Sequence, residues 1–190
     1  MKKDGFSIVE LLVAMAIFSL IAAAVMSTLL TAQHSWSTGS GQAMVTSQLR
    51  RALDRMSREL VESGSSQLQQ IPADGLWYQR MSFRVPEDRS VPPDGSVLDV
   101  NGQIAEWSDW ITYRSGLAQG RTPSLLREVG PVGGAPVSSE VLANYISSLL
   151  FRRQNATPDV VEISLTAFAI TGAGQYMPRT MSTRVKLRNG

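Results

Sequence analysis

Few side chains in this sequence have the types and spacing that catalysis or metal binding requires. None of the 190 residues is a cysteine, so a thiolate nucleophile, a thiolate metal site and a disulfide are all excluded. The one histidine, His34, follows an apolar run and is expected to be a polar residue near a membrane surface. Two acidic pairs, Glu87 with Asp88 and Asp94 with Asp99, carry oxygen ligands that calcium prefers but follow no calcium-loop pattern, so we expect solvated loop acids. The sequence therefore predicts no enzyme, no metal site and no cofactor.

Glu10 stands apart from the other acids because it lies inside the apolar run 6–30, where it is the only charged side chain. A helix over this run is about 37 Å long, which is enough to cross a hydrocarbon layer of about 30 Å. A carboxylate in that layer costs about 2.5–3.5 kcal/mol on insertion scales, a penalty that usually marks a functional group. The nearest cation that could offset it is a free amine at Phe6, paired with the Glu10 of a neighbouring chain in a bundle of staggered helices.

Two simpler interpretations of the run leave Glu10 unexplained. A permanent membrane anchor fits the length of the run and the preceding Lys2 and Lys3, which are expected to stay in the cytoplasm. A cleaved secretory signal has an apolar core of about 7–15 residues followed by small residues at the cut. The run is longer than that, and Leu30-Thr31-Ala32 is a poor cleavage site. The permanent anchor is the stronger of the two alternatives.

The chain after the apolar run predicts an amphipathic helix that ends near Gly64. The stretch 33–41 contains two glycines and predicts either a kink in one long helix or a short break. The charges that follow alternate in sign at four-residue spacing, which is typical of a solvated face rather than of a nucleic-acid surface: Arg50, Asp54, Arg58 and Glu62. The opposite face repeats apolar residues at helical spacing: Val45, Leu49, Leu53, Met56 and Leu60.

The remaining sequence predicts β-strands joined by turn-rich loops. Strands are expected over 81–85, 107–114, 124–129, 146–153, 161–167 and 181–187. We expect a loop over 86–102 and one or two helical turns over 138–145, capped by Ser138 or Ser139. Short links favour an antiparallel sheet with one solvated face, and the amphipathic helix is the expected cover of the other face. The tryptophans Trp77, Trp107 and Trp110 are expected to be buried in the sheet, with an exposed subunit contact as the alternative.

The overall composition is that of a globular domain with an added apolar segment. Hydrophobic residues make up 43% of the chain and charged residues 18%, which excludes a disordered or collagen-like protein. The net charge is +2, and basic residues alternate with acidic ones instead of forming one basic face. Nucleic acid is therefore not an expected partner.

The segment Lys2-Lys3-Asp4-Gly5-Phe6-Ser7-Ile8-Val9-Glu10-Leu11-Leu12-Val13-Ala14 resembles the type III signal of type IV prepilins and pseudopilins. In that family a short basic leader ends in glycine, and a prepilin peptidase cuts after it on the cytoplasmic side. The resemblance implies a cut between Gly5 and Phe6 and N-methylation of Phe6. It also implies that Glu10 pairs with the N-terminal amine of a neighbouring subunit during filament assembly.

The later sequence is similar to the same family over shorter stretches. The segment Leu49-Arg50-Arg51-Ala52-Leu53-Asp54-Arg55-Met56-Ser57-Arg58-Glu59-Leu60 is similar to the helix of minor pilins of the PilW type and of pseudopilins of the J type. The segments 110–114, 125–127 and 185–189 are similar to strands of those groups. The membrane segment has no proline and the chain has no C-terminal cysteine pair, two departures from many major pilins that argue against an abundant major subunit.

The resemblance implies the pilin fold, an α+β class in which a long N-terminal helix, transmembrane and then amphipathic, packs on a C-terminal antiparallel β-sheet. It divides the chain into a leader cleaved by the prepilin peptidase (1–5), a transmembrane half-helix (6–30), an amphipathic half-helix (31–63) and a periplasmic β-sheet domain (64–190).

The implied function is that of a minor type IV pilin, which primes pilus assembly and is incorporated at the tip of the pilus. It would first cross the inner membrane once, with its C-terminal domain in the periplasm, and then reach the cell surface. Its implied partners are other minor pilins, the major pilin, the prepilin peptidase and the inner-membrane assembly platform. The alternatives are a J-type minor pseudopilin of a type II secretion system and, in another class, a tip adhesin or DNA-uptake binding subunit.

Overall fold

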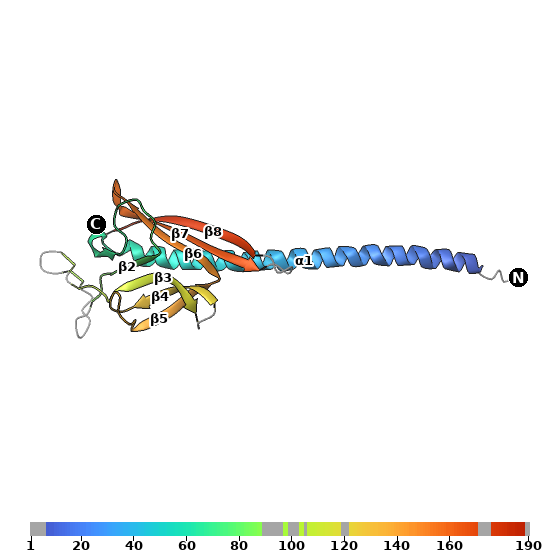
Figure 1. Cartoon of the computed structure of the whole chain (residues 1–190), viewed down its shortest axis with the longest axis horizontal. Helices are drawn as coiled ribbons and strands as arrows, with labels where there is room; N and C mark the ends of the chain where they lie inside the picture. The colour runs from blue at the N-terminus through green and yellow to red at the C-terminus, as the bar shows by residue number, and fades with distance from the viewer. Residues whose placement is uncertain are drawn as a thin grey trace.

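A computed structural model describes residues 7–88, 97–98, 103–104, 106–118, 122–170 and 176–188. Its dominant element is one helix, α1 (Ile8–Val61), which carries the β-strands along one half and extends away from them along the other (Figure 1). The short break considered for 33–41 is excluded, because the helix is continuous there. The hydroxyls of Ser37 and Ser40 donate to backbone carbonyls one turn earlier, at 2.9 and 3.0 Å, so these polar side chains are satisfied by the helix itself.

The strands form two antiparallel sheets. The first has the order β1 (Leu68–Gln69), β2 (Arg80–Phe83), β3 (Ile111–Ala118), β4 (Thr122–Val129) and β5 (Ser138–Asn144). The second has the order β6 (Ile146–Gln154), β7 (Thr157–Ile170) and β8 (Tyr176–Lys186), and a short 3₁₀ helix, η1 (Ser65–Gln67), follows α1. The predicted α+β pilin-like arrangement of a long helix packed on antiparallel strands is confirmed, although the strands divide between two sheets. Tyr145, at a positive φ of 61°, joins β5 to β6 and redirects the chain from one sheet to the other.

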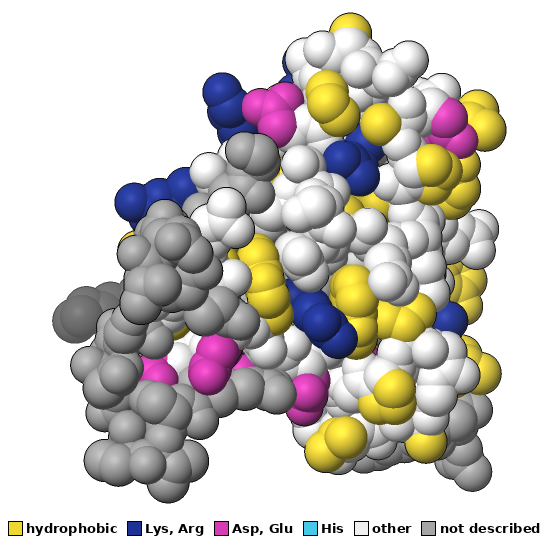
Figure 2. All heavy atoms as spheres, turned by 90° about the vertical axis from the view of Figure 1, so that its left-hand side faces the viewer, with side chains coloured by type: hydrophobic (Ala, Val, Ile, Leu, Met, Phe, Trp, Pro, Cys, Tyr) yellow, Lys and Arg dark blue, Asp and Glu magenta, His cyan; other side chains and the backbone are white. Residues whose placement is uncertain are grey.

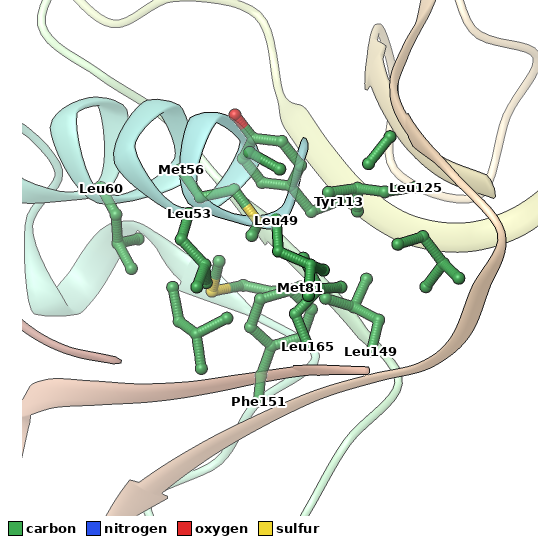
Figure 3. Close-up of a cluster of buried hydrophobic side chains, with 14 of the residues drawn as sticks. Leu49, Leu53, Met56, Leu60, Met81, Tyr113, Leu125, Leu149, Phe151 and Leu165 are labelled. Carbon is green, nitrogen blue, oxygen red and sulfur yellow. The ribbon is translucent and has the colours of Figure 1, made fainter. Parts of the chain in front are cut away.

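The hydrophobic core lies between the second half of α1 and the inner faces of both sheets. Leu49, Met56 and Leu60 have no exposed surface, as the helical spacing predicted. Figure 3 shows the helix side chains Leu49, Leu53 and Met56 beside residues from both sheets. The sheet residues in this contact are fully or almost fully buried: Met81, Tyr113, Leu125, Leu149, Phe151 and Leu165. Truncating one such side chain to alanine typically costs about 2–5 kcal/mol, so this contact fixes the helix on the domain.

The segment 138–145 is a strand up to Asn144, and the prediction of helical turns there is wrong. Residues 138–144 form the edge strand β5, which pairs with β4 in the register Val129↔Ser138 to Ser124↔Asn144. A register shift between Leu125 and Leu126 accommodates an extra residue of β5. A serine cap is a local signal that depends only on neighbouring residues. The backbone of this segment instead forms hydrogen bonds with β4, a strand that the core holds in position.

Two other predicted boundaries need adjustment. The strand expected over 107–114 begins at Ile111 and continues to Ala118, while Trp107 makes only an isolated bridge to Pro86. Much of the expected loop 86–102 lies outside the described residues. Within the described part, Leu98 bridges Ile104. The predicted strands 81–85, 124–129, 146–153, 161–167 and 181–187 correspond to β2, β4, β6, β7 and β8, with ends that differ by a few residues or more.

The buried arginine Arg153 ties the connection after α1 to the second sheet. Its guanidinium donates to the carbonyl of Pro158 from Nε at 2.9 Å and from Nη2 at 2.6 Å. It also donates to the carbonyl of Ile71 at 3.3 Å, and Ile71 lies in the connection that follows α1. Burial lowers the pKa of this guanidinium below its usual value. One side chain thus satisfies carbonyls from two separate segments and holds them together.

Candidate functional site

The first half of α1 has no partner within the described residues of the chain. It is long and apolar enough to cross a membrane, and none of its most apolar stretch is buried inside the structure. Figure 1 shows this half projecting beyond the strands. Its large exposed side chains continue along the whole apolar run: Ile8, Val9, Leu11, Leu12, Val13, Met15, Ile17, Phe18, Leu20, Ile21, Val25, Met26, Leu29 and Leu30. A surface of this extent requires lipid or other helices around it.

Glu10 caps the beginning of the helix. Its Oε2 accepts a hydrogen bond from the backbone N–H of Ser7 at 3.0 Å, and the Ser7 Oγ accepts one from the N–H of Val9 at 3.3 Å. Together these form a capping box, which satisfies two of the backbone donors that a helix start leaves open. The second carboxylate oxygen, Oε1, makes no hydrogen bond or ion pair to any residue in the described ranges. Glu10 can therefore cap its own helix and still offer an oxygen to a cation from outside the chain.

The other two predicted site residues, Gly5 and Phe6, lie outside the described residues, as do Lys2 and Lys3. The cut between Gly5 and Phe6 and the methylation of Phe6 therefore stay predictions. The structure begins at Ser7, and the geometry of Glu10 described above is what it contributes to this site.

A second polar cluster, at the junction of α1 with the first sheet, was missed by the sequence analysis. The Glu59 carboxylate accepts a hydrogen bond from the Tyr113 hydroxyl at 2.9 Å and from Arg127 Nε at 3.0 Å. Arg55, one turn earlier on the helix, donates to Glu59 at 3.2 Å and to Glu140 of β5 at 2.9 Å. Glu59 lies three residues after buried Met56, at the edge of the apolar stripe, and this spacing was the available signal.

Burial and the neighbouring Glu59 carboxylate raise the pKa of the Tyr113 hydroxyl far above its usual value. The hydroxyl therefore stays protonated and remains a donor to Glu59 at any physiological pH. The cluster joins the helix to β3, β4 and β5 through ionic and hydrogen-bonded contacts beside the apolar core. Its chemistry is structural, because each donor faces an acceptor from the same chain.

The charged face predicted for the helix is exposed as expected. Arg50, Asp54 and Arg58 all lie at the surface, and Arg58 Nε donates to the backbone carbonyl of Asp54 at 3.3 Å. Figure 2 looks onto the end of the domain that is remote from the apolar half-helix, and there acidic and basic side chains are interspersed. Mixed charges of this kind are typical of a solvated surface rather than of a nucleic-acid site.

The tryptophans are less buried than predicted. Trp77 is 42% exposed, with the Arg152 guanidinium 4.5 Å from its ring centre, so its expected burial in a sheet is wrong. Trp107 and Trp110 are half-buried, and the Arg84 guanidinium lies 4.4 Å from the ring centre of Trp110. In both pairs the guanidinium lies over the face of an indole ring, a contact that attracts the cation to the ring.

The residues considered for metal or acid–base chemistry do not converge in the described part of the chain. His34 is exposed on α1, and no group of three or more histidine and acidic side chains in the described ranges is placed to hold a metal ion. Glu87 and Asp88 lie in a described segment, whereas Asp94 and Asp99 lie outside the described residues.

Comparison with known families gives one match, and it falls on the beginning of the chain. Residues 1–26 match the prokaryotic N-terminal methylation motif. The match covers Gly5, Phe6, Glu10 and most of the apolar run. No curated protein and no solved structure matches the chain.

The motif, together with the long apolar helix and the antiparallel sheets, indicates a type IV pilin-like prepilin protein. This class is structural rather than enzymatic, and it assembles with other pilins and with membrane machinery. The motif and the exposed apolar half of α1 fit anchoring in a membrane.

Proposed function

We propose that this chain is a minor type IV pilin that primes assembly of a pilus and is incorporated at its tip. The observation that carries the proposal is the pairing of an N-terminal methylation motif with an apolar half-helix that its own domain leaves uncovered. The strands pack only against the second half of α1. The first half is therefore available to contact lipid before assembly and other pilin helices afterwards. The sequence similarity of the helix segment 49–60 to PilW-type minor pilins supports the minor role.

In this proposal the leader 1–5 is removed by a prepilin peptidase, and the new amine at Phe6 is methylated. The helix then leaves the inner membrane for a bundle of pilin helices built on the assembly platform. Contacts with the major pilin and other minor pilins replace lipid contacts along the run 6–30. The open oxygen of Glu10 pairs with the amine of a neighbour, which offsets the cost of burying a carboxylate in the bundle.

The processing step is tested by the intact mass of the membrane-extracted protein, produced with and without the prepilin peptidase of the source organism. We expect loss of residues 1–5 and gain of one methyl group, only when the peptidase is present. An uncut chain, or one cut near Ala32, would contradict the proposal and support a permanent anchor or a secreted protein.

The role of Glu10 is tested by two variants that distinguish its negative charge from its hydrogen bond to the Ser7 N–H in the capping box. Glu10→Ala removes both, whereas Glu10→Gln keeps a side chain that serves in a capping box but cannot form an ion pair. We expect both variants to insert into the membrane normally and both to be depleted from purified pili. Normal incorporation of Glu10→Gln would show that the charge is dispensable and would refute the pairing with a neighbour's amine.

A further inference from the structure

Trp36 is an isolated aromatic residue in the polar stretch that follows the apolar run. Its side chain is 81% exposed, and it makes no ring contact with any residue in the described ranges. Its neighbours along the chain are polar or small: Gln33, His34, Ser35, Ser37 and Thr38. A large indole exposed in such surroundings is not explained by the core of the domain.

The direction of Trp36 also turns its side chain away from the strands that the structure describes. Residues turn by about 100° each around a helix, so Trp36 lies about half a turn away from Val45. Val45 is the first buried residue of the stripe that packs on the sheets. The indole therefore points away from the strands and lies on the free side of α1.

The height of Trp36 above the apolar run matches a lipid headgroup layer. Its Cα lies about 9 Å beyond Leu30 along the helix axis, and side chains on a helix incline back toward its N-terminus. A headgroup layer occupies about 5–8 Å on each side of a hydrocarbon core of about 30 Å. The indole, inclined toward the membrane, falls in that layer, where tryptophan is enriched because its ring is apolar and its N–H is polar.

We propose that Trp36 anchors α1 in the headgroup layer beyond Leu30 and thereby holds Glu10 at the opposite boundary of the membrane. Glu10 and Trp36 are about 39 Å apart along the continuous helix, and a bilayer with its headgroups is about 40–45 Å thick. With Trp36 in one headgroup layer, the Glu10 carboxylate reaches the other and stays hydrated instead of lying in hydrocarbon. The proposal depends on the membrane setting of the proposed function but not on processing or filament assembly.

The chain offers a direct reporter, because its other three tryptophans lie far from the membrane. Trp107, which bridges Pro86, and Trp110 directly precede β3, whose Tyr113 contacts Glu59, about 35 Å beyond Trp36 along the helix. Trp77 adjoins Tyr78, which bridges Phe151 in the half of β6 nearer the end of α1. Only Trp36 is expected to meet a quencher carried by lipid.

The first experiment measures tryptophan emission of the full chain in phosphatidylcholine vesicles whose acyl chains carry bromine near the headgroup or near the bilayer centre. We expect shallow bromine to remove about one quarter of the emission, the share of one tryptophan in four, and deep bromine to remove much less. Trp36→Phe should abolish this quenching, and the matched control Trp77→Phe should retain it. Quenching that survives Trp36→Phe, or that is stronger with deep bromine, would overturn the anchor.

The same experiment separates lipid from a second copy of the chain as the partner of Trp36. The protein-to-lipid ratio is varied over a wide range at constant bromine content. An indole in the headgroup layer is quenched to the same fraction throughout. A fraction that falls as protein density rises would show that another copy covers Trp36, and would overturn the lipid contact.

The second experiment tests the position of Glu10 with single cysteines, which the cysteine-free chain allows. Glu10→Cys and Ala14→Cys, one turn deeper in the apolar run, are treated with a membrane-impermeant maleimide in permeabilised vesicles. We expect Glu10→Cys to react several-fold faster than Ala14→Cys, and Trp36→Ser to slow the reaction at position 10. Equal rates at the two positions, or no effect of Trp36→Ser, would overturn the proposal that Trp36 sets the position of Glu10 in the membrane. The mass and incorporation assays described above test the pilin function independently of this result.

Discussion

Replacing Glu59 by glutamine should destabilise the domain by about 2–4 kcal/mol, because it removes the charged acceptor between the helix and the first sheet. The carboxylate is the shared acceptor of Tyr113, Arg127 and Arg55. Hydrogen bonds to charged groups contribute about 1.5–3 kcal/mol each, and opening a buried pair costs about 3–5 kcal/mol. The Glu59 side chain is 21% exposed, so water compensates part of the loss. A total stability of about 5–15 kcal/mol would make this change easy to measure.

The assay is urea unfolding of the full chain in mild detergent, followed by the fluorescence of the tryptophans in the domain. The detergent keeps the apolar half of α1 helical, so the transition reports on the domain. Asp54→Asn is the matched control, because it removes one negative charge from the exposed face of the same helix. Exposed charges of this kind contribute about 0–1 kcal/mol. A loss for Glu59→Gln no larger than that for Asp54→Asn would refute the structural role of the cluster.

A double-mutant cycle identifies which partner the loss concerns. Arg55 retains its contact with Glu140 when Glu59 is neutralised, whereas Arg127 has only Glu59 as an ion-pair partner in the described part of the chain. Arg127→Met should therefore cost much less in the Glu59→Gln background than in the wild type, with a coupling of about 1–3 kcal/mol. Additive effects would show that Arg127 does not depend on Glu59.

Two further predictions concern groups whose pKa depends on burial. Because the pKa of Tyr113 is raised, the folded chain keeps a proton that the unfolded chain loses above about pH 10. The contribution of Tyr113 to the free energy of unfolding is therefore constant below that pH. Above it, this contribution falls by at most about 1.4 kcal/mol per pH unit. Tyr113→Phe should remove this part of the alkaline decline in urea titrations from pH 8 to 11. Arg153→Lys should lower stability by about 1–3 kcal/mol and make the connection around Ile71 sensitive to proteases, since one ammonium cannot replace a guanidinium that serves carbonyls of two segments. An unchanged urea midpoint and cleavage pattern would contradict this.

The elements that follow a strict period were predictable from sequence because each buries one face. The apolar stripe from Val45 to Leu60 and the alternation over 161–167 both predict the residues that the structure buries. β5 was not predictable in the same way, because Ser138 and Ser139 are exposed and their strand exists through pairing with β4. The change from the first sheet to the second falls at Tyr145, whose positive φ no periodic pattern marks.

The residues of the candidate sites also differ in how far they could be predicted, because some belong to a local motif and others are brought together only by the fold. The spacing of Gly5, Phe6 and Glu10 is local and matches a short motif, so sequence sufficed to suggest it. The Glu59 cluster was missed because its partners on β3 and β4 lie 54 and 68 positions away in the chain. Charge spacing on a helix predicts neighbours on that helix, such as Arg55, but it does not show what a folded sheet brings against them.

The exposed half of α1 has a consequence for how assembly is directed. Lipid chains are as apolar as leucine, so moving the run 6–30 from lipid to a bundle of helices gains little from the hydrophobic effect. The preference for the bundle must then come from close packing and from the few groups that distinguish the two environments. Glu10 has an open oxygen that water solvates at the membrane boundary and that a neighbour's amine pairs in the proposed bundle, and Trp36 has an indole that a headgroup layer holds. In the proposed function the first residue favours the filament and the second favours the membrane, so the balance between them sets how readily the subunit is extracted.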